Sequence, residues 1–221
     1  MLKAVLFDLD GTLIDTPAVI VETAQVVLRA LGQPVAAEEA AAIRATIGLP
    51  LPIAFAGLLG ADAASAQVLD AVERYRVLWR AEVTPRVKKL VYPGALEGVR
   101  ALHASGLKLA VVTGKAQSGA DGTVDVAGLR PFFHFVGGYD SVPRPKPFPD
   151  LALLALERLG VAAEDAVVVG DATLDLAMAR SAGIRSIAVT YGAQPEEVLR
   201  AAGPTWVVRS VAEMIALLQQ M

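Results

Sequence analysis

Apolar and polar positions divide this chain of 221 residues into two kinds of segment. Short apolar runs are typical of strands that are buried on both faces of a parallel sheet. Segments with helical spacing of apolar residues lie between them. The apolar runs are residues 3–7, 108–113, 166–170 and 185–190, with 132–137 as a candidate fifth strand, and the helical segments are 95–105, 150–160, 174–182 and 211–219. This alternation predicts an α/β fold with a doubly wound parallel sheet.

An all-helical block interrupts the alternation after the first strand. Residues 17–31, 36–47, 52–59 and 64–83 are rich in Ala, Leu, Glu and Arg and have helical patterns, and glycine-containing turns at 32–34, 48–50 and 60–62 separate them. Tyr92-Pro93-Gly94 marks the return to strand–helix alternation. We therefore expect residues 1–16 and 90–221 to form an α/β core and residues 17–89 to form an inserted helical cap.

Composition narrows the classes of protein to which the chain can belong. Hydrophobic residues make up 54% and aromatic residues only 5%, which indicates an aliphatic core, and the net charge of −3 favours neither nucleic acid nor a membrane surface as a partner. Cysteine is absent, so disulfides, thiolate catalysis and cysteine zinc sites are excluded. No apolar run approaches the roughly 20 residues of a membrane span, and no signal-peptide pattern opens the sequence. We expect a cytoplasmic protein.

Two carboxylates follow the first predicted strand. Asp8 and Asp10 are two residues apart, and Gly11-Thr12 follows them as a turn. Because alternate residues of a strand point the same way, both carboxylates can approach one point. The two carboxylates repel each other, and a bound cation would relieve this repulsion. One of the carboxylates is then available as a nucleophile.

Other polar groups are expected at the same edge of the sheet, since ligands bind outside the carboxyl ends of parallel strands. Thr113 and Gly114 end the second strand, Lys146 precedes a helix, and Asp171 and Asp175 follow a later strand. Together these groups supply a nucleophile, an acid/base, a hydroxyl, a lysine and acids for a cation. That set suits transfer of a phosphoryl group.

The four motifs, in this order, resemble those of haloacid-dehalogenase-superfamily phosphatases that carry a helical cap after the first motif. The chain is most similar to the phosphoglycolate phosphatase-like members of that superfamily. Shorter matches extend the resemblance over nearly the whole chain, at Tyr92-Pro93-Gly94, Gly137-Gly138, Ala182-Gly183 and Ala188-Val189-Thr190-Tyr191-Gly192. The resemblance implies a Rossmann-like core and Mg²⁺ as the cofactor.

The resemblance also implies roles for the carboxylates. Asp8 would attack phosphorus and form an aspartyl-phosphate, and Asp10 would protonate the leaving oxygen and then activate water. Asp8 and Asp171 would bind Mg²⁺ through their carboxylates and Asp10 through its backbone carbonyl. Asp175 would orient the site from beyond the direct ligands.

The remaining motif residues are expected to hold the phosphate. Thr113 and the Gly114 N–H would bind phosphate oxygens, and Lys146 would offset the charge of nucleophile and phosphate. The backbone N–H groups of Gly11 and Thr12 are further candidate donors.

Four sequence features bear on the substrate. Dehalogenases of this superfamily lack an aspartate at the position of Asp10, and phosphonate-cleaving relatives use a cap lysine, whereas residues 17–83 contain no lysine. Phosphoglycolate phosphatase relatives usually carry Asn where this chain has Gly114. Arg44, in the helical block, is a candidate partner for a substrate carboxylate or second phosphate. Lys115 is expected to have a structural or rim role, and Tyr75 and Trp79 are expected to pack within the cap rather than to clamp the substrate.

These observations predict a Mg²⁺-dependent phosphatase of a small phosphorylated metabolite, with 2-phosphoglycolate as the first candidate. A β-phosphoglucomutase-like phosphotransferase and a pyrophosphatase are alternatives with the same core. A regulatory or interaction protein on the same fold is the alternative without catalysis. The chain is expected to be a monomer or a homodimer.

Overall fold

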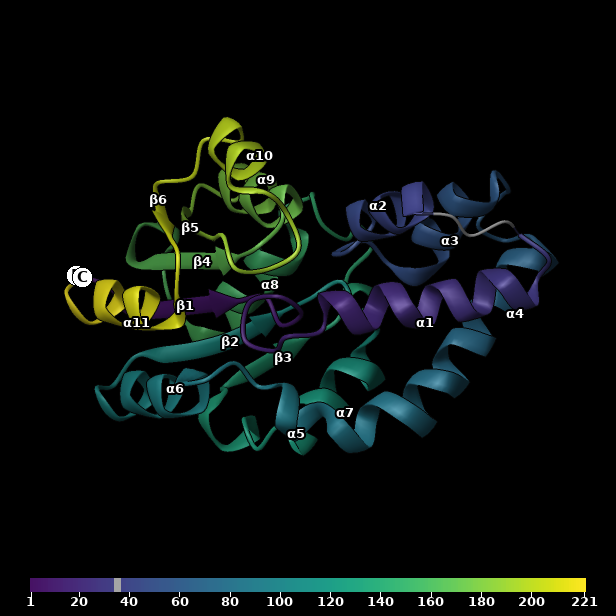
Figure 1. Ribbon diagram of the computed structural model, residues 1–221. Helices are drawn as coiled ribbons and strands as arrows, with labels where there is room; N and C mark the ends of the chain where they lie inside the picture. The colour runs from purple at the N-terminus through teal and green to yellow at the C-terminus, as the bar shows by residue number, and fades with distance from the viewer. Residues whose placement is uncertain (34–36) are drawn as a thin grey trace.

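The computed structural model, which describes residues 1–33 and 37–221, has a six-stranded parallel sheet at the centre of its larger part (Figure 1). The strands are β1 (Ala4–Phe7), β2 (Lys108–Val112), β3 (Phe135–Gly137), β4 (Ala166–Gly170), β5 (Arg185–Val189) and β6 (Trp206–Val208). Their order in the sheet is β3-β2-β1-β4-β5-β6, and every neighbouring pair is parallel. The predicted α/β fold is confirmed.

The register of the central strands aligns their carboxyl ends. Phe7, the last residue of β1, pairs with Val111 of β2 on one side and Val169 of β4 on the other. The ladder continues one step further, because the Asp8 N–H donates to the Val169 carbonyl at 2.8 Å. The residues that follow these strands therefore meet at one edge of the sheet.

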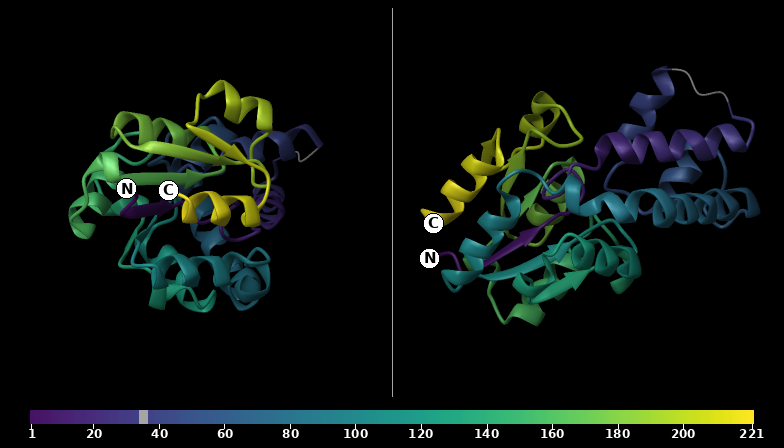
Figure 2. Two further views of the ribbon diagram at one scale, coloured as in Figure 1. Left: turned by 90° about the vertical axis from the view of Figure 1, so that its left-hand side faces the viewer. Right: turned by 60° about the horizontal axis from the view of Figure 1, so that its bottom comes forward.

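Helices cover both faces of the sheet (Figures 1 and 2). They are α6 (Ala95–Ala104), α7 (Gln117–Val126), α8 (Asp150–Leu159), α9 (Thr173–Ser181), α10 (Glu196–Ala201) and α11 (Val211–Gln219). Alternate residues of β1 point to opposite faces. Val5 and Phe7 pack with α6, α7 and α11, whereas Ala4 and Leu6 pack with α8 and α9.

The segment between β1 and α6 is helical and lies beyond the carboxyl ends of the strands (Figure 2). It comprises α1 (Pro17–Ala30), α2 (Ala37–Ala45), α3 (Leu51–Leu59), α4 (Ala66–Leu78), a π-helical turn (Trp79–Val83), a 3₁₀ turn (Thr84–Arg86) and α5 (Val87–Leu90). The helices α1, α2, α3 and α4 and the π-helical turn pack around a hydrophobic cluster of their own, which includes Phe55, Tyr75 and Trp79, whereas Val87 of α5 packs in a cluster of the sheet. The division into units 1–16 with 90–221 and 17–89 stays a prediction. Position 36, where a helix was expected to begin, and the end of the predicted turn at 32–34 lie outside the described residues.

Some elements differ from the sequence-based expectation. The helix α7, the short helix α10 and the strand β6 were not predicted. The helix α7 has the sequence QSGADGTVDV, whose glycines and β-branched residues are poor helix formers. Its helical conformation therefore depends on the tertiary packing of Ala120, Thr123 and Val124. The strand β6 has only three residues, and its extended conformation depends on pairing with β5. In the described part of the chain, no helix is long and apolar enough to cross a membrane.

Candidate active site

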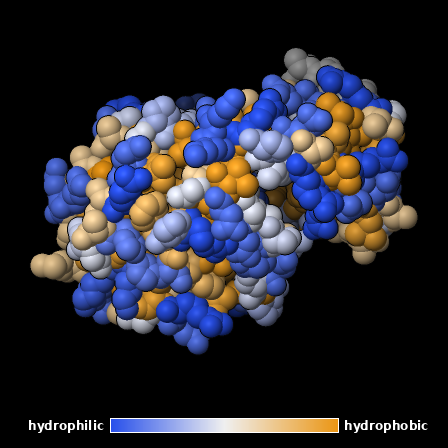
Figure 3. Space-filling model, turned by 90° about the horizontal axis from the view of Figure 1, so that it is seen from below, coloured by the Kyte–Doolittle hydropathy of each residue, from blue (hydrophilic) through white to orange (hydrophobic). Residues whose placement is uncertain are grey.

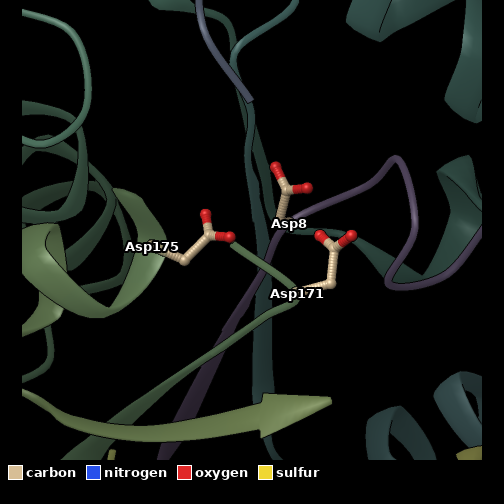
Figure 4. A group of neighbouring side chains, drawn as sticks. All are labelled: Asp8, Asp171 and Asp175. Atoms are coloured by element: carbon tan, nitrogen blue, oxygen red, sulfur yellow. The ribbon is translucent and has the colours of Figure 1, made fainter. Parts of the chain in front are cut away.

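Three buried carboxylates converge at the carboxyl edge of the sheet. Asp8 follows β1, Asp171 follows β4, and Asp175 lies in the first turn of α9. Each offers one oxygen such that these oxygens all lie within 4.8 Å of one another. Figure 4 shows the three carboxyl groups pointing toward a common space. The structure thus brings together side chains from distant parts of the sequence that were predicted to share one site.

Lys146 neutralises part of this charge. Its side chain is buried, and its Nζ donates to Asp8 Oδ1 at 2.7 Å and also to Asp175 Oδ1. The second oxygen of Asp175 accepts the backbone N–H of Ala172 at 3.1 Å. Asp175 is therefore fixed from both sides, and its bond to Lys146 holds the ammonium beside Asp8.

The cluster carries more negative than positive groups. Burial, opposed by the Lys146 ammonium, raises the pKa of Asp8 to about 7. Burial and the neighbouring carboxylates of Asp8 and Asp175 raise the pKa of Asp171 well above its ordinary value. Burial lowers the pKa of Lys146, but the charges of Asp175 and Asp8 outweigh it and raise that pKa overall. A bound cation would relieve this crowding, and carboxylate oxygens are ligands that Mg²⁺ prefers.

Asp171 is held by the loops around it. Its Oδ1 accepts from Thr12 Oγ1 at 3.3 Å, and its Oδ2 accepts from the Ala193 N–H at 2.6 Å. Gly11 has φ +78°, and a Cβ there would lie 2.0 Å from Asp171 Oδ2. Only glycine fits this position, for its conformation as well as for its close approach to the carboxylate. The Thr12 hydroxyl thus binds a carboxylate of the site, and the predicted role of the Gly11 and Thr12 N–H groups stays a prediction.

Asp10 lies between two partners of its own. Thr16 Oγ1 donates to Asp10 Oδ1 at 2.6 Å, and Lys115 Nζ lies 3.0 Å from Asp10 Oδ2. The Lys115 ammonium also lies 4.1 Å from the centre of the Trp79 ring, so this lysine reaches further into the site than the rim position expected for it. Thr16 was missed because a threonine before a helix beginning with Pro17 suggests an N-cap. Its hydroxyl instead contacts Asp10, and it makes no cap bond.

Thr113 and Gly114 lie where the second strand was predicted to end. Thr113 is buried, and its N–H continues the sheet ladder to the Gly137 carbonyl at 3.1 Å. Its Oγ1 accepts from the Lys115 N–H at 3.3 Å. Gly114 touches the helical block, since a Cβ there would lie 2.2 Å from the Gly48 carbonyl oxygen.

A cavity of about 780 Å³ opens from this edge between the sheet and the helical block. Asp8, Asp10, Thr113, Gly114 and Lys115 line its floor, and α1, α3, α4 and the segment 46–49 supply much of the remaining wall. Figure 3 shows a hollow between the two parts of the molecule from below. A group bound in the cavity would therefore meet the carboxylates on one side and the helical block on the other.

Tyr75 and Trp79 line this cavity, although the sequence suggested only packing within the cap. They pack as expected, and they contribute to the cavity wall as well. Their spacing along a helix is the same for both roles, so the sequence pattern could not distinguish them.

Arg44 is exposed and is not among the residues that line the cavity. Its Nη1 donates to the Ala193 carbonyl at 3.3 Å. The rings of His103 and His134 have centres 5.3 Å apart. The His134 N–H donates to the Leu109 carbonyl near the start of β2, so the pair lies at the opposite edge of the sheet from Asp8.

The arrangement is suited to nucleophilic attack by a carboxylate. Asp8 lies at the cavity floor with a lysine beside it, and Asp10 is close by with its carboxyl group fixed by Thr16. An acid/base within reach of a nucleophile that forms a covalent bond is the arrangement that two-step group transfer needs.

The comparisons with known proteins agree with this geometry. The family model described as haloacid dehalogenase-like hydrolase matches residues 5–189. The chain is 43% identical over 215 residues to a protein of Dickeya dadantii named "Probable phosphatase IndB", covering 97% of this chain and 93% of that relative. It is 35% identical over 193 residues to a phosphoglycolate phosphatase of Nitrosospira multiformis, covering 86% of this chain and 84% of that relative.

Solved structures are similar over the full length. The chain resembles a predicted phosphatase from Clostridium acetobutylicum with a TM-score of 0.87 and 27% identity, covering 100% of both chains. It resembles a haloacid dehalogenase-like hydrolase from Streptococcus pneumoniae with a TM-score of 0.82 and 29% identity, covering 99% of both chains. The resemblance predicted from the motifs is confirmed.

Proposed function

The chain belongs to the haloacid dehalogenase-like hydrolases and is a phosphatase, and from this premise we propose that it hydrolyses a small phosphorylated metabolite with the help of Mg²⁺. One observation carries the proposal. Asp8, Asp171 and Asp175 form a buried carboxylate cluster, and Asp8 also lies at the floor of the cavity beside Asp10.

In the proposed reaction, a carboxylate oxygen of Asp8 attacks phosphorus, and the bond from phosphorus to the ester oxygen breaks. Asp10 gives its proton to the leaving oxygen, then takes a proton from the water that cleaves the aspartyl-phosphate. Lys146, bonded to Asp8 at 2.7 Å, offsets the charge that gathers at the phosphoryl group. Thr113 and the Gly114 N–H are the proposed donors to phosphate oxygens.

The carboxylates of Asp8 and Asp171, with the backbone carbonyl of Asp10, would hold the Mg²⁺ ion. Asp175 would act through its bonds to Lys146 and Ala172. The donor set fits the ion, because it consists of oxygens and has an excess of negative charge. When bound, Mg²⁺ would polarise the phosphoryl oxygens and neutralise their charge.

We further propose that residues 17–89 act as a cap on the core formed by 1–16 and 90–221. The hydrophobic cluster of the helical block supports this division, since it lies apart from the two clusters that flank the sheet. A cap over the carboxyl edge would exclude bulk water during the reaction and open for release. It would also limit the substrate to a small molecule, which fits a cytoplasmic metabolic enzyme.

2-Phosphoglycolate is the first candidate substrate to test, because several relatives are named phosphoglycolate phosphatase. A sugar-phosphate mutase and a pyrophosphatase share the core chemistry. A mutase would differ in the acceptor, since it passes the phosphoryl group to a sugar and not to water. A pyrophosphatase would differ in the leaving group, which is phosphate.

The test measures phosphate release from 4-nitrophenyl phosphate, 2-phosphoglycolate, pyrophosphate and a hexose phosphate, with Mg²⁺ and with EDTA. We expect Mg²⁺-dependent release from a monoester and no isomerised hexose phosphate. Asp8→Asn should lower turnover at least about 1,000-fold with an unchanged circular-dichroism spectrum. Asp165→Asn, which removes an exposed carboxylate at the other end of β4, is the matched control. A folded, Mg²⁺-loaded protein that turns over no phosphate compound, or an active Asp8→Asn variant, would overturn the proposal.

A further inference from the structure

We propose that the organic group of the substrate is a flat ring with apolar faces, held against Trp79 and its neighbours, rather than a two-carbon acid. This inference rests on the proposed phosphatase activity and names the substrate class for the same site.

The size of the cavity is the first observation. At about 780 Å³, it lies within the range of about 300–1,000 Å³ that is typical of pockets for drug-sized ligands. A two-carbon phosphate ester would fill only a small part of the cavity and would leave most of its wall exposed to water.

The character of the wall is the second observation. We call the apolar wall the set Ile20, Ile47, Leu49, Leu51, Tyr75 and Trp79, all of which line the cavity. The Tyr75 and Trp79 rings stack with centres 5.6 Å apart and planes 19° apart. Two nearly parallel rings favour a third flat group beside them, because offset stacking adds to the burial of apolar area.

The apolar wall lies next to the reaction centre. Lys115 Nζ is 3.0 Å from Asp10 Oδ2 and 4.1 Å from the centre of the Trp79 ring, so one ammonium group spans the gap between acid/base and aromatic wall. In the proposed pose, a ring attached through one carbon to the phosphate oxygen lies beside Trp79 and Lys115 while phosphorus faces Asp8.

Two of the groups expected to bind a small acid are absent from the cavity lining. Arg44, the guanidinium predicted to read a substrate carboxylate, lies outside the cavity lining and donates to the Ala193 carbonyl. Gly114 provides no side-chain amide. The cations Arg76, Arg80 and Lys115 also line the cavity. Glu73 lies 3.3 Å from Arg80, and Asp10 lies 3.0 Å from Lys115, so acidic partners offset the charge of both. The wall is thus better suited to an apolar ring than to a carboxylate.

The experiment compares benzyl phosphate with ethyl phosphate, which differ in the ring while their leaving alcohols have similar acidity. Phosphate release is measured with Mg²⁺, and 2-phosphoglycolate is included. We expect kcat/KM for benzyl phosphate to exceed that for both other compounds by at least about tenfold, well within what burying the ring carbons provides. Cyclohexylmethyl phosphate tests flatness, and it should fall below benzyl phosphate.

The variant Trp79→Leu should lower the benzyl-to-ethyl ratio of kcat/KM about 3- to 10-fold by removing the stacking contact. Val77→Ala is the matched control, since Val77 lies near the end of α4, two residues before Trp79, but is half exposed and does not line the cavity. Its ratio should equal that of the unchanged protein. Using the ratio cancels any general loss of active enzyme in the Trp79 variant.

A binding readout keeps the inference testable if Trp79→Leu does not fold. The chain has two tryptophans, so a Trp206→Phe variant reports from Trp79 alone. Benzylphosphonate, which is not hydrolysed, should change its fluorescence with Mg²⁺ at concentrations at least about tenfold below those that ethylphosphonate requires.

The outcomes separate the two proposals. If ethyl phosphate or 2-phosphoglycolate is turned over as well as benzyl phosphate, or if Trp79→Leu keeps the ratio, the ring inference fails and the phosphatase proposal stands. If cyclohexylmethyl phosphate equals benzyl phosphate, the flat-ring claim fails. If no phosphate ester is turned over, the proposed function itself fails.

Discussion

Gly114 and Gly48 bring the core and the helical block into backbone contact above the candidate active site. A Cβ on Gly114 would lie 2.2 Å from the Gly48 carbonyl oxygen. Gly48 itself has φ +98° and lies against Leu174 and Ala172, beside the loop that carries Asp171. The segment around Gly48 thus touches two of the loops of the site. The glycine that replaces the usual Asn of related sequences permits this contact.

Substitution of Gly114 should push the helical block away from the core. Gly114→Asn places a side chain where the Gly48 backbone lies, and backbone cannot move aside as a flexible side chain does. We expect KM for any accepted monoester to rise about tenfold and limited proteolysis of the 17–89 segment to accelerate. Gly57→Ala is the control, because a Cβ there meets nothing within 4 Å. An unchanged KM and cleavage rate in Gly114→Asn would contradict a closing role for this contact.

Loss of Lys146 should destabilise the fold. Lys146→Met leaves Asp8 and Asp175 buried without their cation, and breaking a buried ion pair by removing one partner costs about 3–5 kcal/mol. Urea unfolding in EDTA at pH 8 measures the free energy of unfolding. In Lys3→Met, the lost pair with Asp165 lies at the surface and is screened by solvent, so we expect a much smaller loss of the free energy of unfolding. Equal losses in the two variants would show that the buried cluster does not depend on Lys146.

Loss of Lys115 should lower the activity through Asp10 and should leave the stability of the fold nearly unchanged. Lys115→Met removes the ammonium that lies 3.0 Å from Asp10 and 4.1 Å from the Trp79 ring. We expect kcat to fall about fivefold, equivalent to about 1 kcal/mol, because the proposed acid/base loses a partner that orients it. The melting temperature should stay within about 2 °C, since both side chains keep some contact with solvent. An unchanged kcat in Lys115→Met would contradict the proposal that Lys115 orients Asp10.

The stability of the metal-free protein should fall as pH rises. The pKa of Asp8 is about 7 in the folded protein against an ordinary value of 3.8, so the folded state binds the proton more tightly. Its contribution is complete below about pH 4 and is lost as pH rises through 7, amounting to a few kcal/mol, at about 1.4 kcal/mol per pKa unit. The raised pKa of Asp171 acts in the same direction.

Melting curves between pH 4 and 8 in EDTA check this expectation. In Asp8→Asn, the melting temperature should decline less steeply with rising pH, because asparagine does not titrate. Mg²⁺ should raise the melting temperature more at pH 8 than at pH 5, since it binds the ionised carboxylates. A decline equally steep in Asp8→Asn would assign the pH dependence to other groups.

Much of the fold follows from local pattern. The strand β1 is a fully buried run of four apolar residues, and α11 spans the predicted residues. The short strand β6 and the glycine-containing helix α7 depend on pairing and packing that local propensity does not contain. The sequence could predict roles for the carboxylates, Lys146 and Thr113 because the motifs that carry them follow one another along the chain in a fixed order.

The sequence by itself determined the fold class, the family and the chemical groups at the strand ends, since periodicity and motif order are local properties of the chain. Tertiary structure decided which groups meet. It placed the Thr16 hydroxyl on Asp10, Lys115 between Asp10 and Trp79, and Arg44 on the Ala193 carbonyl. The contacts of Lys115 with Trp79 and of Arg44 with Ala193 depend on the relative position of the core and the helical block, which is set by side-chain packing and by the Gly48–Gly114 approach. No spacing along the chain encodes that position.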